Sequence, residues 1–95
     1  MFRTEITFDM SLPQAEIEQL CAMTDAIFAK EDLVCTEKEY GRRVYADKRG
    51  AADFATIGVA LMAMDDVPQL VKSIASAYWY HGAKKENLME TFFDE

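Results

Sequence analysis

Regular alternation near the amino terminus constrains the fold more than any other feature of this sequence. In the segment FRTEITFDM, residues 2–10, every second position from Phe2 to Met10 is apolar apart from Thr4, and charged or polar residues stand between. Successive side chains of a strand point to opposite faces of its sheet. The segment therefore predicts a strand in a sheet with one buried face and one face exposed to solvent.

The next segment, SLPQAEIEQLCAMTDAIFAK at residues 11–30, has the spacing of an amphipathic helix. Ser11 and Gln14 have the separation of a capping box, and Pro13 is tolerated in a first helical turn. Apolar residues then recur every three or four positions, as on the buried side of a helix. Glu18 and Asp25 fall on the opposite, exposed side.

Two further segments add strands and a second helix. Residues 33–47, LVCTEKEYGRRVYAD, predict a hairpin that turns around Gly41, because glycine supplies the positive φ that short hairpin loops need. Residues 51–64, AADFATIGVALMAM, favour a helix, and a buried strand is the alternative. Because Val59 and Met62 lie away from the main apolar side, such a helix is buried on both sides or lies at an oligomer interface.

The last third of the chain predicts more helix. Residues 65–82, DDVPQLVKSIASAYWYHG, suit a helix that ends before Gly82, and residues 85–93 suit a short helix or an edge strand. The resulting order, β-α-β-β-α-α, predicts a single α+β domain over residues 1–95, in which helices pack on one face of a small antiparallel sheet. If the final segment is a strand, a ferredoxin-like order becomes available.

The run SAYWYHG contains the only Trp and the only His of the chain. On a helix, successive residues turn by about 100°, which would direct Tyr78 and His81 inward and Trp79 and Tyr80 outward. Trp and Tyr dominate the energetic hot spots of protein interfaces. We therefore expect Trp79 and Tyr80 to form a contact surface, and cover by another element of the chain is the alternative.

The charge distribution favours a protein partner over a nucleic acid. The net charge is −7, and a domain with this charge is repelled by nucleic-acid phosphates. The charge favours binding to a basic protein, and the alternative is that it only keeps the domain soluble. Five of the ten basic residues fall within residues 38–49, which carry +3 while the rest of the chain carries −10. Arg42 and Arg43 on this hairpin could hold a phosphate or an acidic partner. The alternative is that they protect an exposed sheet edge.

The sequence offers little for catalysis. Two cysteines, Cys21 and Cys35, and one histidine cannot fill a four-ligand zinc site without carboxylates, and no phosphate-binding loop or nucleophile motif occurs. We therefore expect no enzyme activity, no cofactor and no metal. No segment is apolar enough for a secretion signal or a membrane span, so we expect a cytoplasmic protein with free thiols; a disulfide is the alternative.

These observations predict a small acidic domain that binds another protein. The expected contact residues lie on the helices and the hairpin: Trp79, Tyr80, Arg42, Arg43, Glu18 and Asp25. One version is an inhibitor of a basic nucleic-acid-handling protein, of the kind that phages or mobile elements use against host defence. The alternative is a homodimeric ligand- or nucleotide-binding domain, with phosphate at residues 38–49 and residues 51–64 at the dimer seam.

Overall fold

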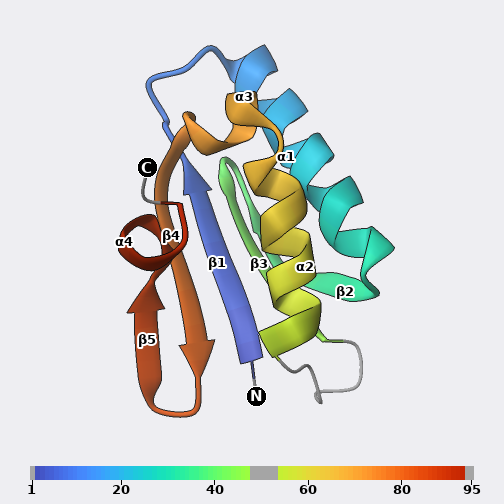
Figure 1. Cartoon of the computed structure of the whole chain (residues 1–95). Coiled ribbons are helices and arrows are strands. Elements are labelled where there is room, and N and C mark those ends of the chain that lie inside the picture. The colour runs from blue at the N-terminus through green and yellow to red at the C-terminus, as the bar shows by residue number, and fades with distance from the viewer. Residues whose placement is uncertain (1, 48–53, 94–95) are drawn as a thin grey trace.

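The computed structural model describes residues 2–47 and 54–93 as a five-stranded antiparallel sheet with helices (Figure 1). The sheet order is β2-β3-β1-β4-β5. The strands are β1 (Phe2–Phe8), β2 (Leu33–Glu39), β3 (Arg42–Asp47), β4 (Ile74–His81) and β5 (Lys84–Asn87). The predicted α+β class is therefore confirmed.

Two longer helices and two single-turn helices accompany the sheet. They are α1 (Gln14–Lys30), α2 (Phe54–Asp65), α3 (Pro68–Val71) and α4 (Leu88–Thr91). The helices α1 and α2 lie side by side on one face of the sheet, as Figure 1 shows. The short α4 packs beside β4, with Leu88 buried in the main core. None of the described helices is long and apolar enough to cross a membrane.

The predicted alternation is confirmed along β1, but the strand ends at Phe8, and Met10, which was expected on the buried face, is 48% exposed. Thr4, Ile6 and Phe8 are fully buried beneath the helices, whereas Arg3 is exposed and Glu5 is half-buried on the opposite face. The core continues into α1 and β3, where Phe28 stacks on Tyr45 with ring centroids 4.0 Å apart. The sheet therefore has one face that packs against the helices and one open face.

The hairpin and both long helices form where the sequence predicts them within the described residues; residues 51–53 of the second predicted helix lie outside these residues. Gly41 adopts φ +72° between β2 and β3, and residues 54–65 are helical rather than extended. The predicted capping box is wrong: α1 begins at Gln14 with Pro13 at its N-cap position. The amide and hydroxyl of Ser11 instead donate to the nearby carboxylate of Asp9, at 2.9 and 2.7 Å.

The predicted helix over residues 65–82 is also wrong: Asp65 ends α2, the single turn Pro68–Val71 is helical, and Ile74–His81 forms β4. This strand pairs with β1 in a register that sets Tyr80 opposite Arg3 and Ala77 opposite Ile6. Tyr and Trp favour strands once a neighbouring strand offers packing. Gly82 does have positive φ, +60°, but in the turn between β4 and β5.

The strand order is the ferredoxin-like one with an added edge strand. β1 lies between β3 and β4, and the elements β1-α1-β2-β3-α2-β4 follow the split β-α-β pattern. The strand that completes this order is β4, not the carboxy-terminal segment that the sequence suggested. That segment contains both predicted alternatives, since β5 leads directly into α4.

Candidate functional site

The described helices cover one face of the sheet and leave the other face open (Figure 1). Side chains directly opposite each other on paired strands share a face. The register pairs Arg3 with Tyr80, Glu5 with Tyr78, and Tyr80 with Lys85, and it sets Arg42 opposite Thr7. The open face is defined here by Arg3, Glu5, Arg42, Tyr78, Tyr80 and Lys85.

Glu5 is the central acceptor of the open face. Its carboxylate accepts a hydrogen bond from the Tyr80 hydroxyl at 2.9 Å, and Arg42 Nε donates to the other oxygen at 2.6 Å. The Arg42 Nη2 forms an ion pair with that same oxygen at 2.5 Å. Arg42 also contacts Glu37 and Glu39 through Nη1, at 3.3 and 3.0 Å. One carboxylate therefore joins β1, β3 and β4.

These contacts change the acid–base properties of the face. Burial by itself would raise the pKa of Glu5, but the hydrogen bonds from Tyr80 and Arg42, with the positive charge of Arg42, hold that pKa below its usual value. Burial and the hydrogen bond to Glu5 raise the pKa of Tyr80. At neutral pH the centre is thus a carboxylate held by a neutral phenol and a guanidinium.

Cations lie over both tyrosine rings. The guanidinium carbon of Arg3 is 4.6 Å from the Tyr80 ring centroid, and the Lys85 ammonium is 4.1 Å from that of Tyr78 and 5.6 Å from that of Tyr80. The two rings are 6.4 Å apart. Such cation–π contacts fix ring and cation relative to each other. The result is an ordered strip of aromatic and charged groups along β4.

The open face is shallow. A depression on it, lined by Arg3, Glu5, Glu37, Arg42, Val44 and Tyr80, holds about 50 Å³. Small-molecule sites usually enclose about 300–1,000 Å³. The geometry therefore suits contact with a broad surface better than enclosure of a substrate.

A second polar cluster lies on the helix-covered side, between α1 and the β2–β3 hairpin. Asp25 accepts hydrogen bonds from the Arg43 Nε at 3.2 Å and the Tyr45 hydroxyl at 2.5 Å, and the Lys38 ammonium lies 3.8 Å away. Burial, followed by the hydrogen bond to Asp25, raises the pKa of Tyr45 far above its usual value. Arg43 also donates to the backbone oxygens of Glu39 and Arg42. This cluster joins α1 to the hairpin.

The predicted contact residues therefore separate into different places. Tyr80 and Arg42 meet on the open face through Glu5, whereas Arg43 and Asp25 pair with each other on the opposite side of the sheet. Glu18 is exposed on α1, beside a hollow of about 230 Å³ that Cys21, Lys38 and Tyr40 also line.

Trp79 does not lie on the surface. It points to the helix side of β4, is 8% exposed, and belongs to the core, with its ring 4.3 Å from that of His81. The expectation that Trp79 points outward depended on a helix at this position. On a strand, Tyr78 and Tyr80 share one face and Trp79 takes the other. The chain itself covers the tryptophan.

Four open-face residues were absent from the sequence-based set: Arg3, Glu5, Tyr78 and Lys85. The alternation of residues 2–10 already assigned Arg3 and Glu5 to the exposed face of a strand. The spacing of Tyr78 and Tyr80, two residues apart, would have added the tyrosines if residues 74–81 had been treated as a strand. The missing information was the pairing of the two segments.

Metal and thiol chemistry receive little support from the described residues. No group of three or more His, Cys, Asp or Glu side chains among them could hold a metal ion. Cys21 and Cys35 are both free thiols. Burial raises the pKa of Cys21, which disfavours the reactive thiolate there.

No family model matches the chain, and neither the curated proteins nor the solved structures contain a match.

Proposed function

We propose that this chain is a non-enzymatic interaction domain that docks a partner protein on its open face. The observation that carries the proposal is the strip of Tyr78, Tyr80, Arg3 and Arg42 on a sheet face that no described helix covers. Tyrosine and arginine are enriched at interfaces and at their hot spots. Ordinary solvated sheet faces need no such concentration of rings and guanidinium groups.

The internal contacts of the open face support binding at low entropic cost. Glu5 holds Tyr80 and Arg42, and Lys85 lies over both tyrosine rings before any partner arrives. Association loses free energy whenever flexible side chains must be ordered. A face whose larger side chains are already held avoids much of that loss.

The charges favour a protein with a basic surface as the partner. The open face itself carries three cations and one carboxylate, so the attraction for a basic partner comes from the net charge of −7 of the whole chain. Exposed acids on the helical side and its loops contribute to it, among them Glu18, Asp32, Asp65 and Asp66. Acidic surfaces steer basic proteins and repel phosphates. An antagonist of a basic, nucleic-acid-handling protein, of the phage or mobile-element counter-defence type, is the version that this charge supports. Such a protein would act in the cytoplasm.

The test compares three baits in pull-downs from the native cell: wild type, Tyr78→Ala, and Lys30→Ala on α1 as a matched control. Tyr78 is half-buried and lies outside the Glu5 hydrogen bonds, so its removal should leave the fold intact. With the purified partner, we expect Tyr78→Ala to weaken binding at least tenfold, as for a hot-spot residue, and Lys30→Ala to leave it unchanged. Equal binding by all three baits would refute the open face as the docking surface.

A homodimeric ligand-binding domain remains the second candidate because of one observation on α2. Val59 and Met62 are 50% and 60% exposed, and they share the outward side of that helix. The basic hairpin gives this candidate less support, since Arg42 and Arg43 already contact carboxylates; Lys48 and Arg49 lie outside the described residues. A mass measurement in solution on wild type and Met62→Glu distinguishes the candidates, because only a seam at α2 would be broken by the added charge.

A further inference from the structure

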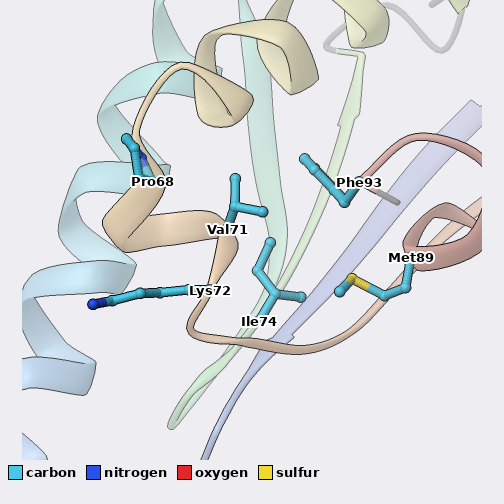
Figure 2. Close-up of a pocket in the computed structure, with 6 residues that line it drawn as sticks. All are labelled: Pro68, Val71, Lys72, Ile74, Met89 and Phe93. Carbon is cyan, nitrogen blue, oxygen red and sulfur yellow. The ribbon is translucent and has the colours of Figure 1, made fainter. Parts of the chain in front are cut away.

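A groove lies between the single-turn helices α3 and α4, and none of its lining residues belongs to the open face (Figure 2). Its volume is about 370 Å³, and it is lined by Pro68, Val71, Lys72, Ile74, Met89 and Phe93. This volume lies near the lower end of the usual range for small-molecule sites, about 300–1,000 Å³. The groove therefore has room for a small ligand.

The groove is apolar along most of its length. Ile74 and Phe93, which are 7% and 4% exposed, belong to the core and form its floor, while Val71 and Met89 are half-buried at its sides. Figure 2 shows these four side chains gathered in one region. Burial of hydrocarbon against such a surface is favourable, and the flexible thioether of methionine adapts to the shape of what it contacts.

Lys72 lies at the other end of the groove. In Figure 2, Lys72 and Pro68 lie on the opposite side of Val71 and Ile74 from Met89 and Phe93. Lys72 is exposed, forms no ion pair with any described residue, and has no acidic residue beside it in the groove lining. On a chain with a net charge of −7, this end of the groove offers an anion an unpaired cation.

From the apolar floor and the unpaired lysine we infer that the groove binds a small amphipathic anion, namely an unbranched aliphatic carboxylate of medium chain length. Its hydrocarbon chain lies over Val71, Ile74, Met89 and Phe93, and its carboxylate meets the ammonium of Lys72. The site is independent of the docking proposed for the open face, because the two surfaces share no residue.

The experiment titrates decanoate, below its micelle-forming concentration, into the ¹⁵N-labelled protein and follows the amide resonances, with decanol as the uncharged probe. We expect saturable shifts at Val71, Ile74, Met89 and Phe93. Lys72→Met should weaken decanoate binding about two- to fivefold, as expected for one exposed ion pair, and leave decanol binding unchanged.

Two further variants make the outcome decisive. Lys30→Met on α1 makes the same change in net charge far from the groove and should leave decanoate affinity unchanged. Met89→Glu places a carboxylate at the apolar end and should weaken decanoate binding at least tenfold. Shifts that map elsewhere, the absence of saturation, or an equal effect of Lys72→Met and Lys30→Met would overturn the inference.

Discussion

Replacing Glu5 by Gln tests how far the open face contributes to the stability of the sheet. The substitution keeps the size of the side chain but removes the negative charge to which Arg42 and Tyr80 both donate hydrogen bonds. The Glu5 and Arg42 side chains are 18% and 26% exposed, so solvent screens their interaction only in part. A hydrogen bond to a charged group contributes about 1.5–3 kcal/mol, and allowance for the exposure leaves an expected loss of about 1–2 kcal/mol at pH 7.

The pH dependence of that loss gives the sharper result. The pKa of Glu5 is lowered by folding, so its contribution is fully present above the unfolded pKa, about 4.3, and disappears as the pH falls through the lower folded value. The difference in unfolding free energy between wild type and Glu5→Gln should therefore shrink as the pH is lowered from 7 towards about 3.

The assay is urea denaturation followed by the fluorescence of Trp79, which is buried and is the only tryptophan of the chain. Each kcal/mol should also lower the melting temperature by about 4–8 °C in a domain of this size. Glu18→Gln, at an exposed position that forms no ion pair with any described residue, is the matched control and should behave as wild type. A Glu5→Gln difference of the same size at pH 7 and at low pH would refute the electrostatic explanation.

Three further changes test single positions. Gly41→Ala and Gly82→Ala both place a side chain at positive φ. At Gly41 the new methyl meets the flexible end of the exposed Met10 side chain, which can move aside, and at Gly82 it meets open space, so we expect a similar loss of about 1–2 kcal/mol at both positions in urea denaturation; a much larger loss at Gly41 would contradict this. Thr4→Val removes a fully buried hydroxyl that has no hydrogen-bond partner among the described residues, so the unfolding free energy should rise by about 1 kcal/mol. A melting temperature below that of wild type would contradict this. Asp25→Asn leaves the buried guanidinium of Arg43 without its carboxylate and should lower the unfolding free energy by about 2–3 kcal/mol, as measured by calorimetry. An unchanged melting temperature would show that the cluster does not stabilise the contact between α1 and the hairpin.

The elements that the sequence predicted well are those whose pattern is complete within one segment. Alternation along residues 2–8 and helical spacing along residues 14–30 each identify a buried side without reference to the rest of the chain. The hairpin was predicted equally well, because its turn requires positive φ at Gly41.

The pattern within one segment did not predict the structure of residues 74–81. Gly82, in the place of a glycine that follows a helix, favoured a helix over residues 65–82. The burial of Ile74, Ala77 and Trp79 is instead set by pairing with β1. Strand preference depends on neighbouring strands more than helix preference depends on neighbouring helices. The open face was missed for the same reason, since Glu5 and Tyr80 are 75 positions apart in the chain.

The central position of β1 has a consequence for how the molecule folds. One side of β1 pairs with β3 and the other with β4. Because β1 is synthesised before β4, its second row of amides and carbonyls is satisfied only when residues 74–81 follow. Pairing between such distant segments slows folding. Until β4 arrives, the free edge of β1 is a template on which another chain can add a strand. The interval between the synthesis of β1 and that of β4 is therefore the period in which this protein is most exposed to aggregation, and a chaperone that shields β1 would act during that interval.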